Sequence, residues 1–102
     1  MNVIDTKNAP GAIGPYSQAF EVNGVIYTSG QIPVNPADGT VADGIAAQAE
    51  QSCKNVGAIL EAAGSGFDKV FKTTCFLADM GDLQHLMKYM QSILPPSRQE
   101  AA

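Results

Sequence analysis

The sequence is poor in residues that build metal centres. It holds a single histidine, His85, and two cysteines, Cys53 and Cys75, which are not in a CxxC spacing. A zinc site made of His and Cys side chains needs three or four ligands, so we expect no metal. For the two cysteines, reduced and buried thiols are favoured over a disulfide.

Positive charge is also scarce. The six basic residues form no run, and the formal net charge is −4. Nucleic-acid binding relies on clustered Lys and Arg, so this composition disfavours a nucleic-acid partner. The sequence also lacks any apolar run of membrane-spanning length, and its N-terminus lacks the basic and apolar regions of a signal peptide. We therefore expect no membrane partner and a cytoplasmic location.

What is present indicates one small folded unit. The 102 residues, 45% of them hydrophobic, predict a single globular domain over residues 1–102. A domain of this size buries a modest share of its unfolded surface, so oligomerisation is a plausible source of added stability.

The first clear element is a β-hairpin. Residues 18–22 and 25–29 are rich in β-formers and flank Asn23-Gly24, the preferred pair for a two-residue type I′ turn. Residues 2–7 are predicted to form a preceding strand.

A long helix is predicted next, from Asp43 as N-cap to Gly64 as the residue that ends it. Apolar residues recur at helical spacing between them. Gly57 lies inside this helix and costs about 1 kcal/mol relative to Ala. Close packing of the helix on a sheet would explain its presence.

The remaining elements are a strand and a second helix. Residues 67–77 alternate with apolar side chains on both faces, as expected for a central strand covered on both sides. The second helix is predicted from Asp82 to Ile93 or Leu94, ended by Pro95-Pro96. The order β-β-β-α-β-α predicts an α+β fold with helices on one face of a mixed sheet.

Two motifs flank the hairpin: Gly14-Pro15-Tyr16-Ser17-Gln18 before it and Ser29-Gly30-Gln31-Ile32-Pro33 after it. Gly gives access to unusual backbone angles and Pro fixes one, so both stretches hold polar groups in a set geometry. A loop that only joined two strands would need neither the tyrosine nor the two glutamines.

With these motifs the sequence resembles the RidA/YjgF family. The resemblance extends from residue 1 to about residue 98. Further matching positions are Gln48, Asn55, Ile59, Leu60, Ala63-Gly64, Val70-Phe71-Lys72-Thr73-Thr74, Asp79-Met80, Tyr89 and Pro96-Ser97-Arg98. The resemblance implies a chorismate-mutase-like fold and a homotrimer with ligand clefts between subunits. We expect the trimer to be held by the sheet face near Thr74 and Phe76.

The same resemblance implies an activity. Family members hydrolyse reactive enamines and imines, such as 2-aminoacrylate, 2-iminobutanoate and 2-iminopropanoate, to 2-keto acids and ammonia, without a cofactor. The small-molecule partner is thus an imino or keto acid.

Four residues match family site positions. Arg98 is the expected carboxylate anchor, because a guanidinium offers two parallel hydrogen bonds; the alternative is a solvated arginine near the terminus. Tyr16 matches the site tyrosine, with packing beside Pro15 as its alternative. Ser29 and Gly30 match the positions beside the substrate carboxylate, with hairpin termination as theirs. We classify Arg98 and Tyr16 as catalytic, and Ser29, Gly30 and Arg98 as substrate-binding.

Gln18 and Gln31 are interpreted as structural residues that orient the loops. Lys72 and Thr74 are assigned to the surface or an interface.

The sequence departs from the family near its C-terminus. Leu86 replaces a polar Asn, Ser97 is a mild change before the site arginine, and Glu100 stands where the family has a site Cys. The family's last strand, with the glutamate thought to position the hydrolytic water, has no counterpart here. An alternative function is therefore a non-catalytic trimeric module that binds small carboxylates. A remote alternative is an endoribonuclease or translation inhibitor.

Overall fold

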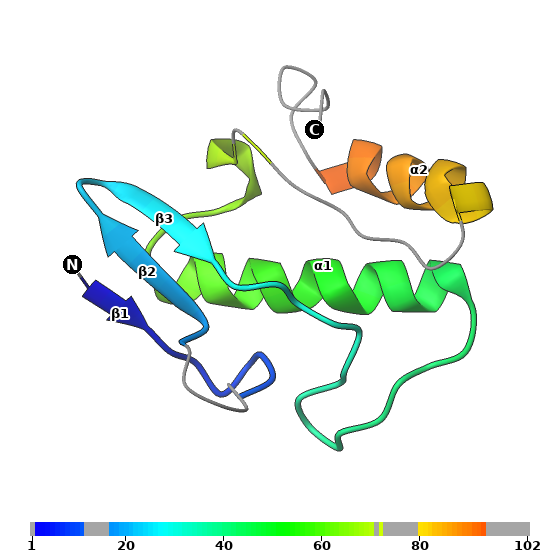
Figure 1. Cartoon of the computed structure of the whole chain (residues 1–102), viewed down its shortest axis with the longest axis horizontal. Coiled ribbons are helices and arrows are strands. Elements are labelled where there is room, and N and C mark those ends of the chain that lie inside the picture. Colours follow the sequence, from blue (N-terminus) through cyan, green and yellow to red (C-terminus); the bar gives the residue numbers. More distant parts are fainter. Residues whose placement is uncertain (1, 12–16, 71, 73–79, 94–102) are drawn as a thin grey trace.

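The computed structural model describes residues 2–11, 17–70, 72 and 80–93. Within them the strands form an antiparallel sheet in the order β1-β2-β3, with two α-helices beside it (Figure 1). The elements are β1 (Asn2–Ile4), β2 (Ala19–Val22), β3 (Val25–Thr28), α1 (Ile45–Ala62), the 3₁₀ turns η1 (Phe67–Lys69) and η2 (Met80–Asp82), and α2 (Leu83–Ile93). This arrangement confirms the predicted α+β class.

The predicted type I′ hairpin is confirmed. Asn23 and Gly24 both have positive φ, at 51° and 81°, as this turn requires at its two central positions. The turn sets the pairing of Val22 with Val25 and hence the register of the two strands. β1 ends at Ile4, earlier than predicted, because the Thr6 N–H donates to the side chain of Gln18 instead of to a strand.

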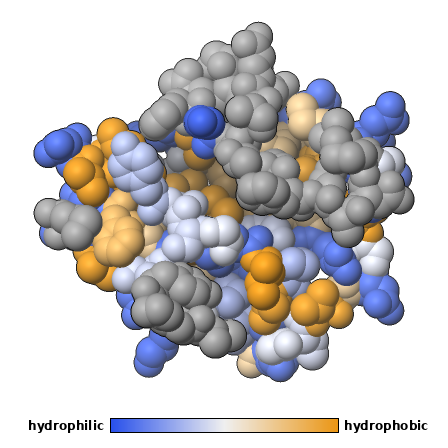
Figure 2. All heavy atoms as spheres, in the orientation of Figure 1, coloured by the Kyte–Doolittle hydropathy of each residue, from blue (hydrophilic) through white to orange (hydrophobic). Residues whose placement is uncertain are grey.

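The sheet has one covered face and one open face. Ile4, Ala19 and Ile26 pack with Ile59 of α1, so they mark the covered face. Successive residues of a strand point to opposite faces. The other face therefore carries the cross-strand neighbours Val3, Phe20 and Tyr27, followed by the pair Val22 and Val25. Figure 2 shows hydrophobic side chains gathered over the strands, at the left of the view.

The predicted N-cap of α1 is wrong, whereas its predicted end is confirmed. The helix begins at Ile45 after Gly44, which has a φ of 91° and provides no side-chain cap. Asp43 is thereby placed outside the first turn. At the other end Gly64, with a φ of 77°, donates to the Glu61 carbonyl at 3.0 Å, and Ser65 donates to the Leu60 carbonyl at 2.8 Å. This pair of bonds is the Schellman motif.

The strand predicted over residues 67–77 is wrong at its start. Phe67–Lys69 forms a 3₁₀ turn, closed by the Val70 N–H donating to the Phe67 carbonyl at 3.2 Å. The turn lays the Phe67 ring against Gly57, where an added Cβ would lie 2.9 Å from a ring carbon. Gly57 therefore permits close packing of this ring, not of the sheet. The rest of the predicted strand, including Thr74, Cys75 and Phe76, lies outside the described residues.

The helix α1 takes part in two apolar clusters. Ala49 packs with Leu86 and Met90 of α2, while Ile59 packs with Ala9 and Ala19 beside the sheet. The prediction for α2 is confirmed, since it begins directly after Asp82 and is described as far as Ile93. None of the helices in the described ranges is long and apolar enough to cross a membrane.

The hairpin generates a stability prediction at Gly24. An added Cβ at Gly24 meets no atom within 4 Å, so Gly24→Ala tests the positive φ alone. We expect a loss of about 1 kcal/mol in the free energy of unfolding, because L-residues other than Asn and Asp are strained in this region. Urea denaturation measures it. Gly24→Asn is the matched control and should lose clearly less; equal losses for Ala and Asn would contradict this account.

Candidate functional site

The two sequence motifs meet at a small depression, here called the Gly30 depression. It has a volume of about 80 Å³ and lies between residues of the segment before β2 and residues of the segment after β3. Its lining residues are Pro10, Gly11, Gln18, Gly30, Gln31, Ile32 and Val34. Of the four predicted site residues, Gly30 lines this depression and Ser29 precedes it. Tyr16 and Arg98 lie outside the described residues.

Gln18 holds one wall of the depression. Its side chain is buried, with 2% exposed, and its Oε1 accepts from the Thr6 N–H at 2.6 Å. Its Nε2 donates to the carbonyls of Thr6, Ala9 and Pro10 at 3.0, 3.3 and 2.8 Å. These backbone groups gain partners that no strand supplies. The structural role predicted for Gln18 is confirmed.

Asn55 of α1 holds the lining segment that follows β3. Its side chain is fully buried, and its Nδ2 donates to the carbonyls of Ile32 and Val34, each at 3.0 Å. Its Oδ1 accepts from Gln51 Nε2 at 2.9 Å. Sequence reasoning noted Asn55 only as a matching family position. Its place four residues before Ile59, on the apolar face of the helix, was the available signal for a buried amide.

Ser29 continues the hairpin pairing into the depression. Its N–H donates to the Gln18 carbonyl at 2.8 Å, and its hydroxyl donates to the Ser17 carbonyl. This geometry fits the hairpin-terminating interpretation of Ser29. Gln31 Nε2 donates to the carbonyls of Ser29 and Gly30, both at 3.3 Å, as expected for a residue that orients the loop. The substrate-binding roles of Ser29 and Gly30 stay predictions.

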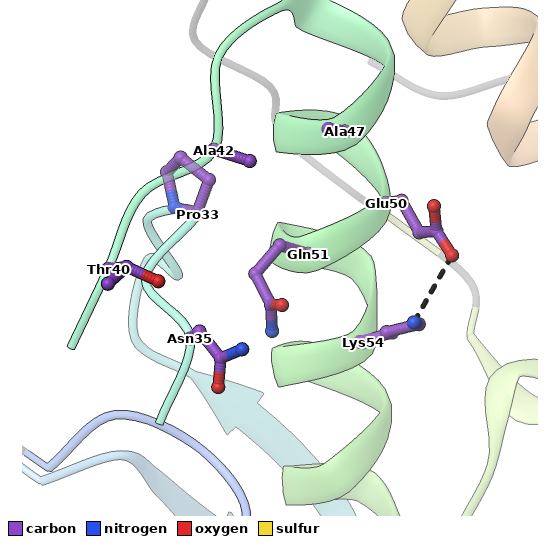
Figure 3. Close-up of a pocket in the computed structure, with 8 residues that line it drawn as sticks. All are labelled: Pro33, Asn35, Thr40, Ala42, Ala47, Glu50, Gln51 and Lys54. Atoms are coloured by element: carbon purple, nitrogen blue, oxygen red, sulfur yellow. Dashed lines mark ion pairs between the residues drawn. The ribbon is translucent and has the colours of Figure 1, made fainter. Parts of the chain in front are cut away.

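A second, more polar cleft of about 200 Å³ lies between the loop 33–42 and α1 (Figure 3). It is lined by Pro33, Asn35, Thr40, Ala42, Ala47, Glu50, Gln51 and Lys54. Figure 3 shows the side chains of Asn35 and Gln51 extending into the space between loop and helix. Glu50 and Lys54 form an ion pair of 3.2 Å that is largely exposed, so it contributes little to stability.

The hydrogen bonds of this cleft support its own loop. Asn35 Oδ1 accepts from the Ala37 N–H at 2.9 Å. The Thr40 hydroxyl donates to Asp38 at 2.6 Å and, together with the Thr40 N–H, lowers the pKa of that carboxyl. Gln51, which lines this cleft, donates to the buried Asn55 amide. Asn55 in turn bonds to Ile32 and Val34, which line the Gly30 depression.

The described lining of the Gly30 depression offers hydrogen bonds and apolar contacts. Its lining, within the described part of the chain, contains backbone groups, two carboxamides and apolar side chains but no titratable group. The described residues also contain no group of three or more His, Cys, Asp or Glu side chains that could hold a metal ion. Tyr16 and Arg98, the predicted acid–base and cationic groups, lie outside the described residues.

The described fold, a hairpin sheet with two helices, is that of RidA-like proteins. The crystal structure of RidA from the Antarctic bacterium Psychrobacter sp. PAMC 21119 is similar over 100% of this chain and 83% of that chain, with a TM-score of 0.94 and 36% sequence identity. The family model described as Endoribonuclease L-PSP matches residues 6–102. The chain therefore belongs to this family, which confirms the resemblance to RidA/YjgF.

The curated relatives that carry the name 2-iminobutanoate/2-iminopropanoate deaminase include a human and a bacterial protein. The human protein is 56% identical over 81 residues, and the protein of Salmonella typhimurium is 52% identical over 79 residues. Each alignment covers 78% of this chain. The chain spans 59% of the length of the human relative and 62% of the length of the bacterial one.

The contact between α2 and α1 generates a prediction on pH dependence. Tyr89 of α2 has its pKa raised, first by burial and then by the Glu50 carboxylate. The folded state therefore keeps the phenol proton at a pH where the unfolded chain has begun to lose it. This contribution to the free energy of unfolding is fully present below the unfolded pKa of about 10 and is lost as pH rises through the folded value.

We expect Tyr89→Phe to lose less stability than the wild type between about pH 9 and pH 11. Urea denaturation at a series of pH values measures both proteins, and the other titrating groups cancel in their difference. Parallel stability curves would contradict the assigned role of Tyr89.

Proposed function

We propose that this protein hydrolyses reactive imines of small 2-amino acids, in the manner named for its relatives, to 2-keto acids and ammonia. The supporting observation is the Gly30 depression, whose lining includes Gln18 of the first family motif and Gly30, Gln31 and Ile32 of the second. The identities of 56% and 52% to proteins named as deaminases of 2-iminobutanoate and 2-iminopropanoate support the same substrate class.

In the proposed reaction each site residue has a separate role. Arg98 binds the substrate carboxylate through a bidentate pair, which orients the C=N carbon. Water adds to that carbon while the nitrogen takes up a proton, and the C–N bond of the tetrahedral intermediate then breaks to release ammonia and leave the keto group. Tyr16 serves as the hydrogen-bonding group at the reacting end, and Ser29 and Gly30 shape the carboxylate end. An enamine substrate first takes a proton on carbon to become the imine.

The proposed assembly is a homotrimer in which the open face of the sheet is covered. Val3 and Tyr27 on this face are each 60% exposed and Val22 is 36% exposed. With Phe20 and Val25 they form a continuous apolar surface across all three strands of the described sheet. Such a surface is typical of an interface between chains.

One observation favours a second candidate, a small-carboxylate-binding module without turnover. Leu86, which replaces the polar family residue, is 8% exposed and packs on Ala49 in the core. The position offers no polar group to a substrate. Binding of 2-oxobutanoate without ammonia release would select this candidate. The endoribonuclease activity in the family name is disfavoured by the net charge of −4 and the scattered basic residues.

The proposed activity predicts ammonia release from enzymatically generated 2-aminoacrylate above the rate in buffer. Arg98→Ala should lower kcat/KM at least about tenfold, because a charge-assisted hydrogen bond contributes about 1.5–3 kcal/mol. Lys88→Ala, which removes an exposed positive charge from α2, is the matched control and should retain the wild-type rate. A wild type no faster than buffer, or an Arg98→Ala variant as fast as wild type, would refute the proposal.

The proposed trimer predicts three times the chain mass by light scattering at micromolar concentration. Tyr27→Lys should shift the protein toward monomer, since it would place a charge in the buried interface. Val41→Lys alters a residue that is 51% exposed outside the sheet, and this control should stay trimeric. A monomeric wild type would contradict the assembly.

A further inference from the structure

We propose that Asn55 is a positioning residue that sets the shape of the Gly30 depression and thereby its preference between the three-carbon and four-carbon imine. The inference rests on the proposed deaminase function. Asn55 does not line the depression. It acts through Ile32 and Val34, whose carbonyls it holds and which do line it.

The geometry of the clamp is specific. Both bonds come from one nitrogen, so they hold two carbonyls at a set separation as well as at a set distance from α1. The Val34 N–H also donates to the Ile32 carbonyl at 2.8 Å, which closes a tight turn around Pro33. Because proline fixes its own φ, this turn has little backbone freedom, and its two held carbonyls both bond to the side chain of Asn55.

The orientation of the Asn55 amide is itself determined by a neighbour. Gln51 Nε2 donates to Asn55 Oδ1 at 2.9 Å, one helical turn away on α1. The bond keeps the oxygen toward Gln51 and leaves the nitrogen free to meet both carbonyls. A fully buried side chain with all these bonds formed has one low-energy arrangement, so the wall it holds is well defined.

The segment that Asn55 holds supplies two apolar residues to the lining of the depression. Ile32 and Val34 are the two branched apolar residues of its lining, and the other lining residues are Pro10, Gly11, Gln18, Gly30 and Gln31. The two candidate substrates differ by one methylene. An apolar wall discriminates such a difference by about 10-fold to 200-fold at most, and a shift of the wall changes that ratio.

The test compares kcat/KM for 2-iminobutanoate with kcat/KM for 2-iminopropanoate. Partial unfolding lowers both values by the same factor, so their ratio reports wall position and not stability. We expect Asn55→Ser to change the ratio at least about threefold. Gln51→Met, a milder change that removes only the bond orienting Asn55, should change the ratio in the same direction and keeps the test valid if Asn55→Ser folds poorly.

Met90→Ala is the matched control, because it weakens the core between α1 and α2 away from the depression. It should lower the melting temperature and leave the ratio unchanged. Ratios equal to wild type in both Asn55→Ser and Gln51→Met would overturn the inference, as would an equal change in Met90→Ala.

Failure of the proposed function gives a different result. A wild type that releases no ammonia contradicts that function, and the ratio is then read from calorimetric dissociation constants of 2-oxobutanoate and pyruvate. A changed binding ratio in the two variants supports the role of Asn55, whereas an unchanged ratio, or no binding of either acid, overturns it.

Discussion

The structure around the candidate site depends on two buried carboxamides. The segments before β2 and after β3 have backbone groups that no strand pairs, and each segment lies partly out of water. Gln18 satisfies the first segment and Asn55 the second. An unsatisfied buried carbonyl or N–H costs about 1–3 kcal/mol, so the two amides decide which loop conformation is stable. The depression is the space left between the two segments so held.

The helix α1 connects this arrangement to the rest of the molecule. One part of it packs on the sheet through Ile59, another packs on α2 through Ala49, and Asn55 projects from between them. The loop after β3 is therefore bonded to the same helix that packs in both apolar clusters.

Local signals in the sequence predicted the local structure. The Asn23-Gly24 turn and the Gly64 helix end follow from backbone preferences of single residues, so they were predicted correctly. Asp43 was wrong as N-cap because Gly44 adopts a φ of 91° and takes that position itself. The start of the strand at Phe67 was wrong because its ring packs on Gly57, a contact between distant residues that strand periodicity does not contain. Asn55 was missed as a clamp for the same reason, since its partners lie more than 20 residues away. For the site, Gly30 of the second motif lines the depression, but its substrate-binding role and the roles of Tyr16 and Arg98 stay predictions from sequence resemblance.

The bonding of Gln18 has a consequence for which substitutions the fold tolerates. Its oxygen meets an N–H donor and its nitrogen meets three carbonyl acceptors, so the environment distinguishes the two ends of a nearly symmetric group. Glutamate has almost the same shape as glutamine but offers only acceptors in its ionised form. At this position a side chain is therefore accepted for its arrangement of donors and acceptors. In the neighbouring apolar cluster a side chain is accepted for its volume. Substitutions of Gln18 are therefore limited by the need for a donor at one end of the side chain and an acceptor at the other. A size-conserving exchange that costs little stability at Ile59 costs more at Gln18.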